Sequence, residues 1–358
     1  MDDNLIVRLH RELDNIKKPM TFMEICGTHT NEIGKIGLRS ILDGKIRLIS
    51  GPGCPVCVTA SKYIDYIYAL AVFKNIGIIT YGDMIRVPGS RPNINLMNAR
   101  ALGAEVHMVY SAMDSLNIAK ENPSKEYVFL AIGFETTMPA TCILLNEVIN
   151  RGINNLKIMS LHKKVEPVMR ELLKDDLNID GFLCPGNVAV IIGEDGFKFL
   201  EKENMLGVIA GFTEEEILRA IITLINKSNN NEVGLFNEYK SVVNKEGNII
   251  AREYFDKFFE LKPSLWRGLG IIENSGYELK NGLQKYEIKS KYAIEETINL
   301  IKKDENKYIC RCGDVLKGKI TPLECESFKK ICNPSFPIGP CMVSNEGTCG
   351  AYYKYERR

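Results

Sequence analysis

The stretch IRLISGPGCPVC, residues 46–57, decides the fold class of this 358-residue chain. Its first five residues form an apolar run typical of a buried β-strand, and the other seven form a loop of glycine, proline and cysteine. A helical pattern follows in residues 59–73, where one face carries Tyr63, Ile64, Ile67, Leu70 and Ala71. A strand, a loop and a helix in this order indicate one unit of a parallel sheet covered by helices.

The same order recurs along the first two thirds of the chain. Apolar runs that end in loops lie at 21–25, 46–50, 76–80 and 104–110, and again at 127–133, 156–162, 179–184 and 206–212. We therefore predict an α/β protein with two small parallel-sheet domains of similar plan, near residues 20–118 and 119–227. An amphipathic helix in residues 2–18 extends the first domain to residues 1–118.

Residues 228–358 differ from the two predicted domains. The pattern in 228–300 indicates polar helices and connections, and the segment 308–358 is rich in cysteine and proline. A segment of that size with little apolar periodicity usually needs a metal or a cluster to stabilise it. Because parallel sheets bind ligands at the carboxyl ends of their strands, we further expect the two sheet edges to face each other across a cleft.

Composition and charge limit the classes of protein that fit. Hydrophobic residues make up 45% of the chain and charged residues 25%, and the net charge is +1. This balance gives no electrostatic reason to expect binding to nucleic acid or to an anionic membrane. The N-terminus lacks the features of a signal peptide, and no apolar run is long enough to span a bilayer. We expect a cytoplasmic protein, in which close cysteines are metal ligands or redox groups.

Three cysteines lie in the first sixth of the chain. Cys54 and Cys57 form a C-x-x-C pair after a strand and before a helix, the context in which such pairs carry out redox chemistry. Backbone amides at a helix start stabilise a thiolate, the form that attacks disulfides or binds soft metals. Half of a zinc knuckle, or a buried inert pair, is the alternative; no second C-x-x-C or histidine pair at zinc-finger spacing supports the zinc knuckle.

The third of these cysteines, Cys26, begins the sequence CGTH, which ends with His29. A cysteine and a histidine three residues apart are by themselves more often core and loop residues. Neighbouring strand ends lie only about 5 Å apart, however, so Cys26 could meet the C-x-x-C pair. Three thiols with a histidine suit iron or copper. Glu135 and Asp83 are candidate polar groups in the same cleft.

Six further cysteines occupy the last fifty residues with the spacing C-x-C-x12-C-x6-C-x8-C-x7-C. They are Cys310, Cys312, Cys325, Cys332, Cys341 and Cys349. Four thiolates are the usual complement of a [4Fe–4S] cluster, and structural zinc with four cysteines is the alternative. The long and irregular spacings favour the cluster.

Several long motifs of the chain together resemble a known family. They are MEICGTHT, GPGCPVC, YGDMIRVPGS, GFETTMPAT and the C-terminal run from Cys325 through NPSFPIGPCMVSNEGTCGAYY. These motifs resemble the hydrogenase maturation (HypD) family over nearly the whole chain. The resemblance implies two thioredoxin-like or Rossmann-like domains and a [4Fe–4S] domain. It also implies a role in assembling the Fe(CN)2CO group of [NiFe]-hydrogenases, as a monomer in a complex with a HypC-type chaperone and a HypE-type cyanide donor.

The resemblance also implies roles for particular residues. The essential central thiols match Cys26, Cys54 and Cys57, with His29 beside them. The cluster ligands it implies are Cys325, Cys332, Cys341 and Cys349. Cys312, and with less support Cys310, is a possible substitute ligand, and Glu346 is an acid next to the last ligand. One position departs from the family pattern PGHV: Asn187 stands in place of the histidine, and an amide does not carry protons at neutral pH.

Two other functions remain open from the sequence. One is a free-standing disulfide reductase of the ferredoxin:thioredoxin reductase type, in which a cluster passes electrons to the C-x-x-C pair. The other is a binding module with a structural zinc domain. The sequence favours a maturation scaffold whose Cys54 and Cys57 cycle between dithiol and disulfide, and leaves open whether the chain is itself an enzyme.

Overall fold

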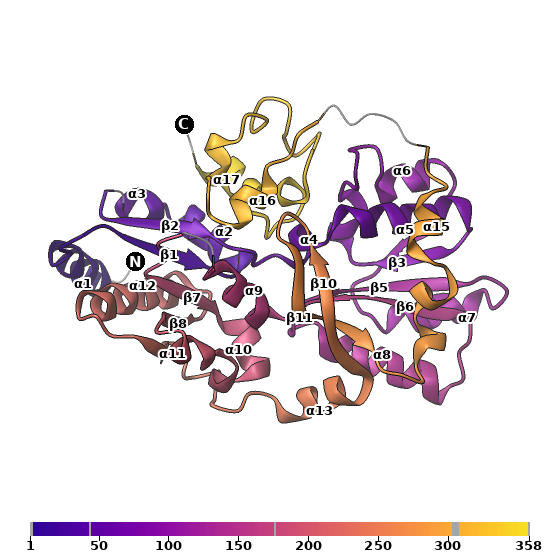
Figure 1. Ribbon diagram of the computed structural model, residues 1–358, viewed down its shortest axis with the longest axis horizontal. Helices are drawn as coiled ribbons and strands as arrows, with labels where there is room; N and C mark the ends of the chain where they lie inside the picture. The colour runs from indigo at the N-terminus through magenta and orange to yellow at the C-terminus, as the bar shows by residue number, and fades with distance from the viewer. Residues whose placement is uncertain (1–2, 43, 175–176, 303–307, 357–358) are drawn as a thin grey trace.

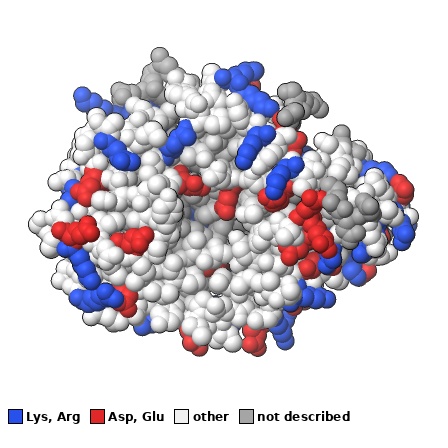
Figure 2. All heavy atoms as spheres, turned by 180° about the vertical axis from the view of Figure 1, so that it is seen from behind, with Lys and Arg blue, Asp and Glu red and all other residues white. Residues whose placement is uncertain are grey.

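Two parallel sheets lie side by side in the computed structural model, and the C-terminal segment lies against one end of both (Figure 1). The structure describes residues 3–42, 44–174, 177–302 and 308–356. Within these residues, no helix is long and apolar enough to cross a membrane. Figure 2 shows positive and negative side chains interspersed over the face in view, in keeping with a net charge of +1.

The first sheet has five strands, and all their pairings are parallel. Its order is β2 (Ile46–Ser50), β1 (Met20–Glu24), β7 (Gly181–Pro185), β8 (Leu206–Ala210) and β9 (Gly234–Asn237). β1 lies inside the sheet, where Phe22 is opposite Leu48 of β2 on one side and Gly181 of β7 on the other. Most residues of these strands are buried, as expected for a parallel sheet with helices on both faces.

The second sheet has four strands, also all parallel. Its order is β4 (Val106–Met108), β3 (Gly77–Thr80), β5 (Tyr127–Gly133) and β6 (Leu156–His162). The longest pairing joins β5 to β6, and every residue of β5 is buried. The α/β class with two parallel, Rossmann-like sheets is therefore confirmed.

The predicted division of strands between the sheets is wrong. We expected the first four apolar runs to form one sheet and the next four to form the other, on either side of residue 118. The chain instead lays down β1 and β2, crosses to the second sheet for β3 to β6, and returns to pair β7 with β1. Apolar runs predict where strands lie, but they do not predict which distant strand each one pairs with.

Helices that the sequence predicts are present. α1 (Asp3–Asp14) buries Leu5, Leu9 and Leu13 against α12 (Glu214–Asn229). A capping box starts α12, as its sequence predicts: the Glu216 amide donates to the Thr213 hydroxyl at 3.3 Å, and the Thr213 amide donates to the Glu216 carboxylate at 3.0 Å. The helical pattern of residues 59–73 corresponds to α5 (Ser61–Phe73).

The remaining helices alternate with the strands or are short segments between them. Their bounds are α2 (Gly27–Lys35), α3 (Leu38–Leu42), α4 (Pro55–Val58), α6 (Leu96–Ala101), α7 (Asp114–Glu121), α8 (Met138–Asn150), α9 (Val165–Leu172), α10 (Gly186–Ile192), α11 (Phe199–Lys202), α13 (Ile249–Phe258), α14 (Ile288–Lys291), α15 (Ile294–Ile298), α16 (Cys312–Leu316) and α17 (Thr348–Tyr355).

A β-hairpin occupies part of the region where we expected only polar helices and connections. Its strands are β10 (Phe259–Trp266) and β11 (Gly270–Leu279), which pair antiparallel with an irregularity between Lys262 and Ser264. Pro263 at this irregularity breaks the strand pattern in the sequence, which explains why the hairpin was missed. The hairpin tip reaches α4, because Arg267 donates from its backbone amide to the Val58 carbonyl at 2.8 Å.

The C-terminal segment consists of turns and short helices around a small apolar cluster of its own. Phe328, Ile338, Met342 and Tyr352 form this cluster together with Cys332. α17 packs on α2, and the turn of 3-10 helix Pro340–Met342 packs on α4. The segment therefore covers the two loops that carry the N-terminal cysteines.

Candidate functional site

The C-x-x-C pair lies where the sequence predicts, after β2 and at the start of a helix. Cys54 precedes α4 and its sulfur accepts a hydrogen bond from the Cys57 backbone amide at 3.1 Å. Both side chains are buried, with Cys57 completely shielded from solvent. Pro55 at the first helical position fixes the turn between the two thiols.

Cys26 lies directly beside this loop. It precedes α2, and the Gly27 amide donates to the Gly53 carbonyl at 3.3 Å. A Cβ on Gly53 would lie 2.4 Å from the Cys26 nitrogen, so only glycine permits this approach. Burial raises the pKa of the Cys26 thiol to about 11, although the His29 backbone amide acts in the opposite direction. The expected contact between the two cysteine loops is therefore present.

The C-terminal cysteines reach the C-x-x-C pair, which the sequence did not reveal. The buried thiol of Cys341 interacts with the thiols of Cys312 and Cys57, and these two interactions lower the pKa of Cys341. Burial raises the pKa of Cys57, as do its contacts with Cys341 and Cys54. Cys312 in turn interacts with Cys310. Each of the thiols of Cys54, Cys57, Cys341, Cys312 and Cys310 thus acts on the protonation of the next, and we call this series the line of thiols.

One cavity in the C-terminal segment is lined by all six of its cysteines, Cys310, Cys312, Cys325, Cys332, Cys341 and Cys349. Apolar side chains, among them Phe328 and Met342, complete the wall. Thiolates in an apolar cavity are a donor set that suits a [4Fe–4S] cluster. Among the described residues, no group of three or more His, Cys, Asp or Glu side chains is arranged to hold a single metal ion.

The carboxylate of Glu346 lies near Cys26, and that of Asp83 lies near Glu346. The Thr28 hydroxyl donates to Glu346 at 3.4 Å, and the Ser344 hydroxyl donates to Asp83 at 3.0 Å. Burial raises the pKa of Glu346, and the nearby charge of Asp83 raises it further. A Cβ on Gly27 would lie 2.2 Å from the Glu346 carbonyl, so the C-terminal segment is seated tightly on the CGTH loop.

His29 and Glu135 form their hydrogen bonds with partners other than the cysteines. His29 donates from Nε2 to the Gly211 carbonyl at 2.8 Å and stacks on Phe212 at 4.9 Å, and burial lowers its pKa to about 4. Glu135 accepts a hydrogen bond from the Val165 amide at 3.1 Å, and burial raises its pKa to about 7. Within the described chain, no hydrogen bond joins either side chain to a cysteine.

The two cysteines outside the N-terminal and C-terminal groups, and Asn187, have structural surroundings. Cys142 is buried on α8, and Cys184 is buried in β7 with its thiol 3.9 Å from the Phe182 carbonyl. The amide oxygen of Asn187 accepts from the Val188 backbone amide at 2.9 Å, in the first turn of α10.

Comparison with known proteins identifies the class of protein as the hydrogenase maturation factors. A family model described as "HypD: Hydrogenase formation hypA family" matches residues 2–356. The hydrogenase maturation factor HypD2 of Bradyrhizobium diazoefficiens is 38% identical over 95% of this chain and 90% of its own length. The hydrogenase maturation factor HypD of Escherichia coli is 37% identical over 96% and 91%.

A third relative is archaeal. The putative hydrogenase expression/formation protein MJ0993 of Methanocaldococcus jannaschii is 38% identical over 98% of this chain and 95% of its own. The chain therefore belongs to the HypD family, and the resemblance seen in its motifs is confirmed.

Proposed function

We propose that this chain is a cytoplasmic maturation scaffold with a redox function, which assembles the Fe(CN)2CO group of [NiFe]-hydrogenases. Membership of the HypD family supports the general role. The line of thiols that joins Cys54 and Cys57 to Cys341 and Cys312 carries the redox part of the proposal. The partners are a HypC-type chaperone, which delivers iron, and a HypE-type donor, which carries cyanide as a thiocyanate.

The iron being assembled is a substrate in this proposal. Cys26 and one thiol of the C-x-x-C pair bind it, because their two loops touch and thiolates are ligands that iron accepts. The buried thiol of Cys26 holds its proton at neutral pH, so iron binding must release that proton. Glu346, whose carboxylate acts on the Cys26 thiol, could receive that proton.

The redox step balances with the dithiol as the reductant. Release of cyanide from a thiocyanate takes two electrons and leaves a thiolate on the donor. Oxidation of Cys54 and Cys57 to a disulfide supplies two electrons and releases two protons. Neither thiol needs to move far, since the Cys57 amide already contacts the Cys54 sulfur.

The cysteines that line the cavity of the C-terminal segment would hold a [4Fe–4S] cluster. To restore the dithiol, the Cys54–Cys57 disulfide takes up two protons and two electrons, which an external one-electron donor would supply one at a time through the cluster. The ligands we predicted are Cys325, Cys332, Cys341 and Cys349. A second ligand set replaces Cys341 with Cys310. Cys310 lines the same cavity as the four predicted ligands, so it is available as the replacement.

Alanine variants of Cys341 and Cys310 distinguish the two ligand sets. Replacing a ligand should lower the iron content and the visible thiolate-to-iron absorbance of the anaerobically purified protein, whereas replacing the other cysteine should leave both unchanged. A colourless wild-type protein that contains zinc would contradict the cluster altogether.

Infrared spectroscopy of the anaerobic complex with the HypC-type partner tests the assembly role. Cyanide and carbonyl stretches should be present in the wild-type complex and absent with Cys26→Ala. Efficient reduction of a protein disulfide without either partner, in the absence of those stretches, would favour the free-standing reductase instead.

A further inference from the structure

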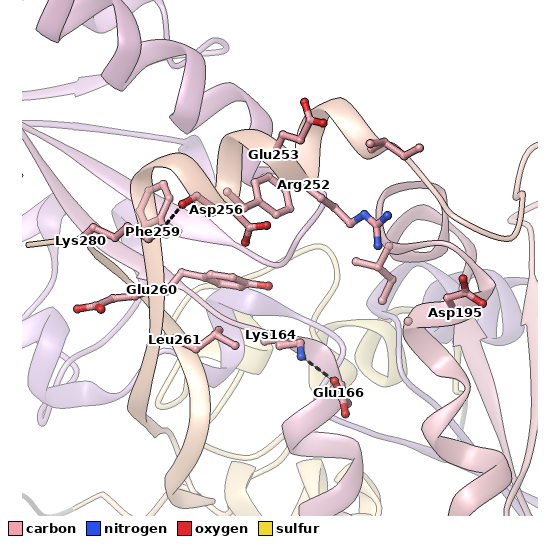
Figure 3. A pocket seen from close by; sticks show the side chains of 15 residues that line it. Lys164, Glu166, Asp195, Arg252, Glu253, Asp256, Phe259, Glu260, Leu261 and Lys280 are labelled. Carbon is pink, nitrogen blue, oxygen red and sulfur yellow. Dashed lines mark hydrogen bonds and ion pairs between the residues drawn. The ribbon is translucent and has the colours of Figure 1, made fainter.

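A cavity of about 780 Å³ lies at the base of the β10–β11 hairpin, where the hairpin meets α9, α13 and the turn after α10 (Figure 3). None of its lining residues is a cysteine, so it is separate from the thiol site. Its volume falls in the range of small-molecule sites, which is roughly 300–1,000 Å³. Nothing in the maturation function proposed above uses it.

Apolar side chains form one part of the wall. Phe255 of α13 and Phe259 of β10 are almost fully buried and give the cavity an aromatic surface. Ile249 and Leu261 lie nearer the opening, where 47% and 36% of their surfaces are exposed. A ligand with an apolar body would cover these side chains and gain free energy by removing them from water.

Arg252 of α13 is the unusual polar group of this cavity. Its Nε atom is buried without a hydrogen-bond partner, and none of the ion pairs found among the described residues involves it. In Figure 3 its guanidinium extends from α13 toward the side of the cavity where Asp195 lies. Within the described residues the side chain of Arg252 forms no hydrogen bond or ion pair, although its charge acts on the nearby Asp195. A guanidinium that is partly shielded from water and makes no hydrogen bond is suited to bind a carboxylate with two parallel hydrogen bonds.

The other cations of the cavity already have partners. Lys164 donates to Glu166 at 2.6 Å, as the dashed line in Figure 3 marks, and Lys280 donates to the Asp256 carbonyl. Among the described residues that line the cavity, Arg252 is therefore the cation that a ligand would meet.

Acidic side chains at the cavity limit the charge of a ligand. Glu253 and Asp256 are exposed and Glu260 is half-buried, and all three line the cavity. They would repel a ligand with several negative charges. A single carboxylate placed on Arg252 avoids most of that repulsion.

We propose that this cavity binds a small molecule with one carboxylate and an apolar body. The carboxylate pairs with Arg252, and the apolar body covers Ile249 and Leu261, which are exposed at the opening. Tyr277 lines the same cavity and, because burial raises its pKa, keeps a proton that it can donate to the ligand.

Two probes with the same body and opposite charge test the proposal on the full-length protein. 4-Phenylbutyrate should bind saturably, with a Kd on the order of 1 mM, as followed by saturation-transfer NMR. 4-Phenylbutylamine should bind at least about tenfold more weakly, although the acidic rim would favour it if Arg252 played no part. Absence of saturable binding of 4-phenylbutyrate, or a preference for the amine, would overturn the proposal.

Three variants locate the site. Arg252→Gln should raise the Kd for 4-phenylbutyrate about tenfold, because a charged hydrogen-bonded pair is lost. Arg8→Gln, the same change at an exposed arginine of α1, should leave the Kd unchanged. Leu261→Glu adds a negative charge at a partly exposed wall position without disturbing the core, and should also weaken binding. Unchanged binding in Arg252→Gln would contradict the proposed site. If that variant fails to fold, unchanged binding in Leu261→Glu would contradict it instead.

Discussion

The two parallel sheets share one architecture, yet the carboxyl ends of their strands carry different chemistry. The first sheet leads into the loops of Cys26 and Cys54, and the C-terminal segment covers these loops with further thiols. The second sheet leads into Glu135 and Lys163, and the β-hairpin covers them: Lys163 donates to Ser264 at 2.8 Å and lies over Trp266. The segment that covers a sheet edge therefore decides which groups meet there.

The largest difference in hydrogenase maturation is expected between two variants that each remove one buried thiol, one beside the first sheet and one beside the second. Cys57→Ala should abolish hydrogenase maturation, because it breaks the line of thiols between Cys54 and Cys341. Cys142→Ala makes the same change at an equally buried cysteine of α8, beside the second sheet, and should preserve maturation. Hydrogenase activity in cells that depend on the introduced variant measures both. Equal activity of the two variants would contradict a special role for the thiols beside the first sheet.

A smaller effect is expected from weakening the contact between the C-terminal segment and the loop of Cys26. Gly27→Ala places a Cβ 2.2 Å from the Glu346 carbonyl, so it should lower the free energy of unfolding by about 3 kcal/mol and weaken maturation. Gly34→Ala lies in the same helix and meets only the Tyr355 side chain, at 3.2 Å, which can move. Its loss of stability in denaturant titrations should be much smaller. Equal losses would mean that the C-terminal segment is not held tightly at Gly27.

The smallest effect concerns how the stability of the protein depends on pH through Glu135, which follows a strand of the second sheet. Burial raises the pKa of Glu135 from 4.5 to about 7, so the folded state binds its proton more tightly than the unfolded state. Stability should fall as the pH rises from about 5 to 8, by roughly 2 kcal/mol from this group. Glu135→Gln should remove that part of the decrease, as measured by denaturant titration at each pH.

The control for this last prediction is Glu121→Gln, at an exposed position in the last turn of α7. An exposed carboxylate is hydrated in both states, and its replacement should leave the pH profile unchanged. If Glu135→Gln follows the wild-type profile as closely as the control does, the buried carboxyl group does not govern stability there.

Local features of this chain could be predicted from the sequence. The strand and helix of the Cys54 loop, the capping box at Thr213 and the apolar face of α1 all follow from patterns within about a dozen residues. The contact between the loops of Cys26 and Cys54 also followed, because neighbouring strand ends meet at one edge.

Features that depend on distant parts of the chain could not be predicted in the same way. β7 pairs with β1 although the whole second sheet lies between them in the chain, and no pattern in either strand identifies this partner. The approach of Cys341 to Cys57 depends on how an irregular segment folds over α4. His29 was expected among the thiols, but its ring turns to Gly211, a partner with no signal in the local sequence.

The return of the chain to its first sheet has a consequence for biosynthesis. The ribosome releases β1 and β2 long before β7, so these strands must wait for their partner while the whole second sheet emerges. Cys26, Cys54 and Cys57 emerge early too, whereas the C-terminal segment that packs on their loops is translated after both sheets. During that interval the thiols are open to oxidants and stray metal ions, and slow translation or oxidative stress should damage the nascent chain more than the finished protein.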